Sequence, residues 1–157
     1  MIDYRWWVFI HIAGVFGFLL AHGVSVAVTF RLRRERDREK MRGLIQLSGS
    51  TIRMFYGSLA LLLAGGVVAG FKGHWWHQKW IWISLGLLVG VSLLMLALAR
   101  PYYRRVSEAA MLRASGAPRM SDEELATLLR SPLPVMIAGL GFAALLAILY
   151  LMIFKPA

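Results

Sequence analysis

The sequence predicts an all-α integral membrane protein, an antiparallel four-helix bundle, and three observations support this fold class. Hydrophobic residues make up 59% of the 157-residue chain and charged residues only 17%, a balance far from that of a soluble domain. Four long apolar runs cover residues 6–30, 54–71, 80–99 and 133–154. None of them alternates polar with apolar residues as a membrane barrel strand does. Because only helices and closed barrels satisfy every backbone group in lipid, we expect residues 1–157 to form a single membrane domain of helices.

Each apolar run is long enough to cross a membrane. A helix needs roughly 20 residues to span the hydrocarbon core, and the second run reaches that length when Ile52 and Arg53 lie among the headgroups. The first run is too long for a signal peptide and its cations follow it, so we expect it to stay on the mature protein. The third run should end at Pro101, which lacks the amide that would bond to Ala97.

The distribution of cations predicts the orientation of the chain. The segments 31–53 and 100–132 hold fourteen of the eighteen Lys and Arg residues. By the positive-inside rule these segments are cytoplasmic loops, and both termini face outward. All six tryptophans fall at the outer interface of this topology. We therefore expect a multi-pass protein of the bacterial inner membrane, with anionic lipid headgroups as partners at its cytoplasmic face.

The second cytoplasmic loop contains the signature of a short amphipathic helix. Ser121 is followed three residues later by Glu124, which is the spacing of a capping box. Leu125, Leu128 and Leu129 then form an apolar stripe. We expect this helix to lie at the inner membrane surface.

Glycines with small-xxx-small spacing occur in two of the apolar runs. Gly66 with Gly70, and Gly86 with Gly90, would let neighbouring helix backbones approach closely. Close packing within one bundle is the interpretation we favour for both pairs, and a dimerisation face is the alternative.

His11 and His22 lie on one face of the first predicted helix. Eleven residues correspond to about 20° beyond three full turns and about 16 Å along the axis. An ionisable residue inside a membrane segment indicates a functional site, because it is costly without a partner. The alternative is that each neutral imidazole donates a hydrogen bond to a neighbouring helix and only holds the bundle together.

Axial ligation of haem b between antiparallel helices is the function that most naturally uses such a histidine stripe. Two haems would need four membrane histidines, and His11 and His22 are the only two in the apolar runs. His74 and His77, in the outer loop, could reach the end of the bundle near His11 but not His22. One chain can therefore assemble at most one bis-histidine haem without another type of ligand.

The outer segment HWWHQK is a second candidate site. His74 and His77 would share a face if helical, and together they could bind a soft or borderline metal such as copper or zinc. The alternative is that this tryptophan-rich loop only anchors the protein at the interface. The methionines of the apolar runs show no close pair in sequence and are interpreted as packing residues: Met54, Met95, Met136 and Met152.

Several classes of function are excluded or unsupported. The chain has no cysteine, which excludes thiolate metal sites and thiol catalysis. The basic segment 31–42 contains no aromatic residue for base stacking, so nucleic acid is not an expected partner despite the net charge of +10. No apolar run contains Asp or Glu, which argues against a carboxylate-based ion path. Whether the protein is an enzyme is left open.

Two stretches carry a resemblance to a known group of bacterial membrane proteins. FIHIAGVFGFLLAHG in the first run and WWHQKWIWISLGLLVG at the entry to the third resemble a predicted-integral-membrane family related to copper-resistance protein D and to the HemJ-type protoporphyrinogen oxidases. The HemJ-type members imply haem bound near His11, with Lys79 as the matching lysine. The copper-resistance branch implies copper handling at the outer face by His11, His74 and His77.

The sequence thus predicts a small membrane protein with a haem or copper site centred on His11. His22 lies on the same face, and His74, His77 and Lys79 close the outer mouth of the site. The competing hypothesis is a non-catalytic scaffold or subunit in a homo-oligomer or membrane complex, in which the histidines are structural.

Overall fold

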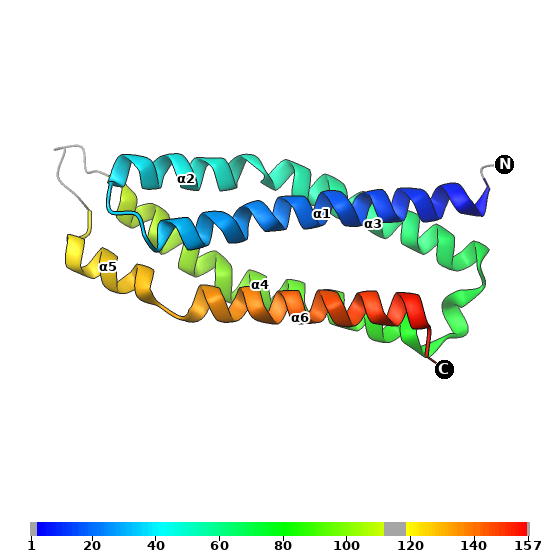
Figure 1. Ribbon diagram of the computed structural model, residues 1–157. Helices are drawn as coiled ribbons and strands as arrows, with labels where there is room; N and C mark the ends of the chain where they lie inside the picture. Colours follow the sequence, from blue (N-terminus) through cyan, green and yellow to red (C-terminus); the bar gives the residue numbers. More distant parts are fainter. Residues whose placement is uncertain (1–2, 112–118, 157) are drawn as a thin grey trace.

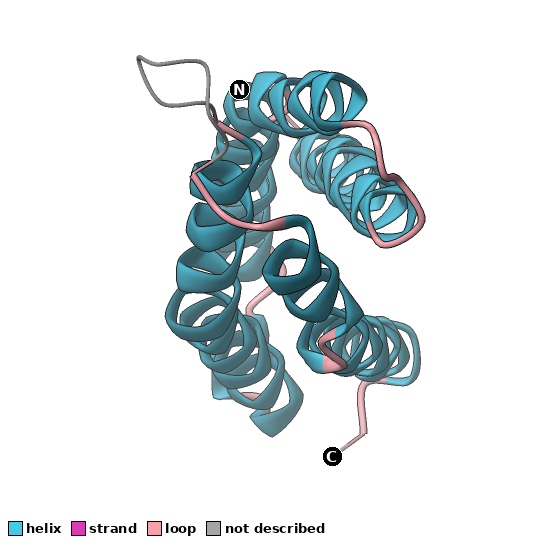
Figure 2. Cartoon of the chain, turned by 90° about the vertical axis from the view of Figure 1, so that its left-hand side faces the viewer, coloured by secondary structure: helices cyan, strands magenta, loops and turns pink. Residues whose placement is uncertain are grey.

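The computed structural model describes residues 3–111 and 119–156, and within these ranges the chain is helical and contains no strand. The helices are α1 (Tyr4–Leu32), α2 (Arg38–Ser50), α3 (Ile52–Lys72), the short 3₁₀ helix η1 (Trp75–His77), α4 (Lys79–Ala110), α5 (Asp122–Arg130) and α6 (Leu133–Phe154). The all-α prediction is confirmed. Figure 2 shows these helices from one end of the bundle.

Four segments of the described chain are long and apolar enough to cross a membrane, and each contains one of the predicted apolar runs. The chain runs back and forth along the bundle, so that both termini lie at the same end (Figure 1). That end also holds η1 and is called the tryptophan end. The opposite end, formed by the α1–α2 turn, the end of α4 and α5, is called the basic end.

The long helices associate as two pairs, α1 with α3 and α4 with α6. Glycines bring the backbones of the first pair together. A Cβ on Gly65 would lie 2.6 Å from the backbone nitrogen of His11, and a Cβ on Gly14 would meet the backbone of Leu62. Gly66 packs against the His11 ring and Gly70 against the Trp76 indole, as expected of residues that allow close packing within the bundle.

The expectation for Gly86 and Gly90 is wrong. A Cβ at either position of α4 would have no neighbour within 4 Å in the described structure. α4 meets other helices through different residues, including the buried Trp80 and Ser84, so this glycine pair faces away from the bundle.

The hydrophobic core of the chain lies at the basic end and joins four helices. Its buried members come from α1, α2, α4 and α5: Val28, Leu32, Met41, Tyr102, Val106, Ala109, Ala110, Leu125 and Leu129. The segments 31–53 and 100–132 are therefore more than loops. In the first, α2 begins at the N-cap Asp37, whose carboxylate accepts hydrogen bonds from the backbone N–H groups of Glu39 and Lys40.

The helix of the third span does not end at Pro101, as the missing amide led us to expect, but continues as α4 to Ala110. A proline inside a helix costs about 3 kcal/mol. Burial of Tyr102 and Val106, at about 1.5–3 kcal/mol for each fully buried apolar side chain, offsets that cost.

The short helix predicted in the second loop is confirmed as α5, and its capping box is complete. The Ser121 hydroxyl accepts from the backbone N–H of Glu124 at 3.2 Å, and the Ser121 N–H donates to the Glu124 carboxylate at 3.0 Å. Leu125 and Leu129 are buried in the core, so the apolar stripe faces the protein.

Candidate functional site

His11 is fixed to the neighbouring helix by a hydrogen bond. Its Nδ1 lies 2.7 Å from the backbone carbonyl oxygen of Leu62 in α3. Because a carbonyl oxygen can only accept, Nδ1 must carry the proton and donate it. In the neutral ring the lone pair is then on Nε2. The fold therefore selects one tautomer of His11.

Gly66 makes room for this ring. A Cβ on Gly66 would lie 2.8 Å from Nδ1 and 3.0 Å from Cε1 of His11, closer than a real Cβ comes to a neighbouring atom. The ring therefore lies in a gap that only a glycine leaves on α3, one helical turn from the carbonyl of Leu62 that accepts its proton.

Nε2 of His11 remains accessible. The buried side-chain polar atoms without a hydrogen-bond partner in the described chain are Nε1 of Trp76, Nε1 of Trp80 and Oγ of Ser84. Nε2 of His11 also makes no hydrogen bond among the described residues, but unlike these three atoms it is not fully buried. It can therefore receive a ligand from outside the chain.

His22 lies deeper in α1 and has different neighbours. Its ring stacks on Phe18 with the centroids 6.3 Å apart and the planes 6° from parallel. Among the residues described, neither ring nitrogen makes a hydrogen bond. The structure thus gives His11 and His22 separate surroundings.

The histidines of the predicted outer site are exposed at the tryptophan end. His74 precedes η1 in a left-handed conformation with φ of 56°, and His77 lies 3.2 Å from the side-chain amide of Gln78. Lys79 begins α4 and is exposed. Within residues 3–111 and 119–156 no group of three or more His, Asp or Glu side chains could hold a metal ion. His11, His74 and His77 therefore do not form a ready-made three-ligand metal site in the described structure.

Most charged side chains of the protein lie at the basic end. The Glu35 carboxylate in the α1–α2 turn accepts the backbone N–H groups of Asp37 and Arg36. These bonds hold the pKa of Glu35 below its ordinary value.

A family model described as "Predicted integral membrane protein (DUF2269)" matches residues 6–156. The chain belongs to this family. The match includes all four apolar runs and every candidate residue discussed above. The comparison with curated proteins found no match, and neither did the comparison with solved structures. The integral membrane branch of the resemblance is confirmed, while its relation to copper-resistance protein D and to the HemJ-type proteins stays a prediction.

In this DUF2269 chain, two buried polar side chains of α4 were not predicted from the sequence. Trp80 is 7% exposed and Ser84 is 6% exposed, yet neither polar atom has a partner in the described chain. Their spacing of four residues, which puts both on one helix face, was the available signal. Nor does the sequence indicate that Met95 and His22 both lie beside Gly141, because the three residues belong to helices that are far apart in the chain.

Proposed function

We propose that this DUF2269 protein is a small integral membrane protein that binds a metal-containing group, haem b or a copper ion, through Nε2 of His11. The supporting observation is the 2.7 Å bond between Nδ1 of His11 and the Leu62 carbonyl. A histidine that binds a metal almost always donates its other ring N–H to a carbonyl, carboxylate or water, which fixes ring and tautomer. His11 meets this condition without help from the ligand.

The residues of α1 and α3 would hold the group from one side. Imidazole suits both haem iron and copper, and a haem iron bound there would supply one-electron transfer. Further ligands have three sources in this proposal. At the tryptophan end, the further ligand would be His74 or His77, with Lys79 beside it. A group that reaches deeper into the bundle would use His22. In a homo-oligomer, the second ligand would be His11 of another copy. The resemblance to the copper-resistance and HemJ-type proteins adds weight to copper and haem as the two candidates.

The same proposal places the basic end in the cytoplasm of a bacterium and both termini outside its inner membrane. The support is the cation bias of segments 31–53 and 100–132. Exposed arginines at this end, among them Arg34 and Arg104, would meet anionic headgroups, each worth roughly 1 kcal/mol near the surface.

The test compares the wild type with His11→Asn. The side-chain amide of asparagine can donate to the Leu62 carbonyl from about the position of Nδ1, but it offers no nitrogen in place of Nε2. The protein is purified in detergent from cells supplied with haem precursor and copper. We expect the wild type to show a Soret band with sharp α and β bands after dithionite, or bound copper by elemental analysis. His11→Asn should lose that signal while its helix content stays unchanged and its thermal unfolding midpoint equals that of the wild type without the bound group.

A non-catalytic scaffold or subunit is the second candidate function. The same bond favours it, because an interhelical hydrogen bond in a membrane is by itself worth about 0.6–1.7 kcal/mol and gives His11 a structural purpose. A colourless wild-type protein without bound metal would refute the binding proposal. The scaffold then predicts that His11→Ala lowers the unfolding midpoint and that His11→Asn does not.

A further inference from the structure

A histidine of α1 and a methionine of α4 both lie beside Gly141 of α6. A Cβ on Gly141 of α6 would lie 2.5 Å from Cε of Met95 and 3.8 Å from Nε2 of His22. Both side chains therefore reach within 4 Å of one point, which the side chain of any other residue at 141 would occupy. The thioether sulfur of Met95 is one bond from that Cε.

The imidazole of His22 is oriented by aromatic packing. Its ring lies parallel to the ring of Phe18, which is buried and packs in turn on Phe55 at a centroid distance of 4.8 Å. Among the described residues no hydrogen bond reaches either nitrogen of His22. An imidazole within an apolar span is costly without a partner, so Nε2 has a bonding capacity that the protein alone leaves unused.

The chemistry of the two ligands selects the ion. Imidazole and thioether are both neutral, and thioether is a soft ligand that favours copper(I). Hard divalent ions need several oxygen ligands, and none of the four apolar runs contains Asp or Glu. The cost of moving an ion into a low-dielectric interior rises with the square of its charge, so a monovalent ion enters far more readily.

We propose that Nε2 of His22 and the sulfur of Met95 bind copper(I) between α1, α4 and α6. Gly141 is a positioning residue, because its missing side chain lets Met95 approach His22. The site uses neither His11 nor the tryptophan end. It is independent of the function proposed above when the group at His11 takes its further ligand from the tryptophan end or from a second copy rather than from His22. It also differs from the outer copper site, which would use exposed histidines.

The first test is a competition titration of the purified full-length protein. Copper(I), kept reduced with ascorbate, is distributed between the protein and a chromogenic copper(I) chelator. We expect Met95→Leu to weaken binding roughly 10- to 100-fold or more, the loss that even outer-shell partners of a metal cause. His22→Phe, which keeps an aromatic ring against Phe18, should weaken it as much.

Met136→Leu is the matched control, because Met136 lies on α6 with 65% of its surface exposed. We expect it to bind copper(I) as the wild type does. Equal affinity in the wild type, Met95→Leu and Met136→Leu would overturn the proposal, as would a wild type that takes no copper(I) from the chelator.

A second measurement uses only the wild type and is independent of how the variants fold. Methyl-labelled methionine and ring-labelled histidine are followed by NMR while silver(I), a redox-silent soft ion, is added. We expect one of the eight methionine methyl signals and one histidine ring signal to shift together by one equivalent. Shifts of histidine signals alone, or of several methionines at once, would contradict the site.

His11→Asn separates this site from the one proposed above. The substitution should remove the group bound at His11 and leave intact the copper(I) affinity that Met95→Leu weakens. If it abolishes copper(I) binding, the copper belongs to His11 and the site at His22 and Met95 is refuted.

Discussion

His11 depends on the two glycines that face it on α3. Gly65 lets the α1 backbone approach and Gly66 leaves space for the ring, so that Nδ1 reaches the Leu62 carbonyl. Any larger residue at 66 must push the imidazole away from its acceptor. The tautomer of His11, and with it the availability of Nε2, is therefore set by a neighbouring backbone rather than by another polar side chain.

We expect Gly66→Ala to destabilise the protein by about 1–3 kcal/mol, the usual cost of overpacking. The added Cβ would lie 2.8 Å from Nδ1 of His11. Gly57→Ala, also in α3, is the control, because a Cβ there has no neighbour within 4 Å in the described structure. Thermal unfolding in detergent, followed by circular dichroism, should show a lower midpoint for Gly66→Ala only. Equal midpoints would mean that the ring is not held against Gly66.

Glu35 gives the α1–α2 turn a dependence on pH. Two backbone N–H groups stabilise its carboxylate, so the pKa in the folded state is below that in the unfolded state. The resulting stabilisation is complete above the unfolded-state pKa and is lost as the pH falls through the folded-state value. Carboxyl ¹³C NMR should find Glu35 titrating below an ordinary glutamate, and Glu35→Gln should make unfolding less sensitive to acid. An ordinary titration midpoint would contradict these bonds.

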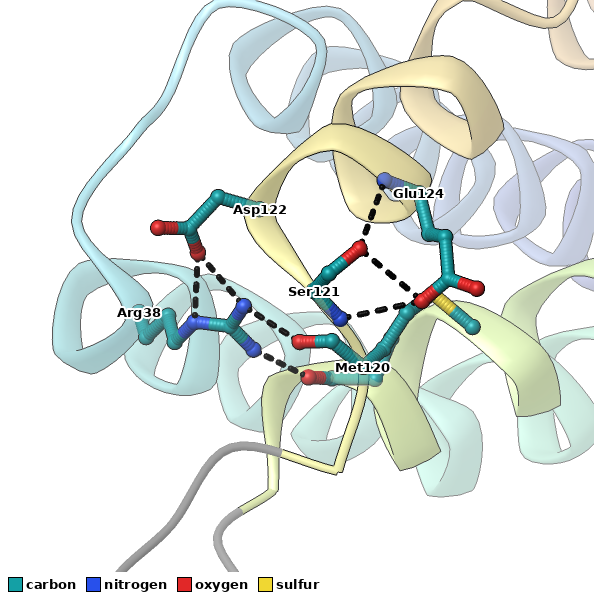
Figure 3. Close-up of polar contacts among 6 residues, drawn as sticks. Arg38, Met120, Ser121, Asp122 and Glu124 are labelled. Atoms are coloured by element: carbon teal, nitrogen blue, oxygen red, sulfur yellow. Dashed lines mark hydrogen bonds and ion pairs between the residues drawn. The ribbon is translucent and has the colours of Figure 1, made fainter.

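At the scale of the elements, Arg38 ties α2 to α4 and α5 (Figure 3). Its guanidinium donates to the carbonyls of Ala109 and Met120, each at 2.7 Å, and to the Asp122 carboxylate at 2.6 Å. The Arg38 side chain is 13% exposed whereas that of Asp122 is 93% exposed. An ion pair with so exposed a partner contributes little, so the two carbonyl bonds account for most of the stabilisation.

We therefore expect Arg38→Lys to cost about 1.5–3 kcal/mol, the range for a hydrogen bond to a charged group, and Asp122→Asn to cost far less. An ammonium group cannot reach both carbonyls in the planar geometry of the guanidinium. Arg42→Lys is the control, because Arg42 is exposed and its hydrogen bond, to the Arg38 carbonyl, stays within α2. Chemical denaturation should find Arg38→Lys the least stable of the three variants, with Asp122→Asn and Arg42→Lys close to the wild type. A larger effect of Asp122→Asn than of Arg38→Lys would show that the ion pair dominates.

At the scale of the whole molecule, two helix pairs are joined mainly at the basic end. There the buried core connects α1 and α2 with α4 and α5, and Arg33 donates to the carbonyls of Arg130 and Ser131. At the tryptophan end η1 links α3 to α4, and the Lys155 ammonium lies 4.0 Å from the centre of the Trp75 ring. The basic end is thus a packed unit that holds the membrane helices in register.

The proposed orientation can be tested with single cysteines, because the natural chain has none. Lys72→Cys lies at the tryptophan end and Arg42→Cys at the basic end, and both positions are exposed. In intact cells a membrane-impermeant maleimide should label Lys72→Cys only, and permeabilised cells should label both. Labelling of Arg42→Cys alone in intact cells would invert the topology.

The membrane helices and the capping box of α5 could be predicted because each depends on residues close in sequence. Hydrophobicity over a single run, or the spacing of Ser121 and Glu124, is enough for such features. The continuation of α4 past Pro101 could not be predicted, since it depends on burial of Val106 against distant helices. His11 was predicted as a site residue, but its acceptor on Leu62 was not, because a backbone carbonyl leaves no signature in the sequence. That Met95 and His22 both lie beside Gly141 could not be predicted either, because it depends on the relative placement of three helices.

The tautomer of His11 and the ligand on its Nε2 can both be measured in the wild-type protein, and they decide whether this histidine binds a metal. Solid-state ¹⁵N NMR of ring-labelled histidine in lipid, with His11→Asn to assign the signal, reports on both nitrogens of the ring. We expect a protonated Nδ1 hydrogen-bonded to the Leu62 carbonyl, and an unprotonated Nε2 whose signal is displaced by the bound metal. A protonated Nε2, or an Nε2 signal unaffected by metal in the protein as purified, would contradict it.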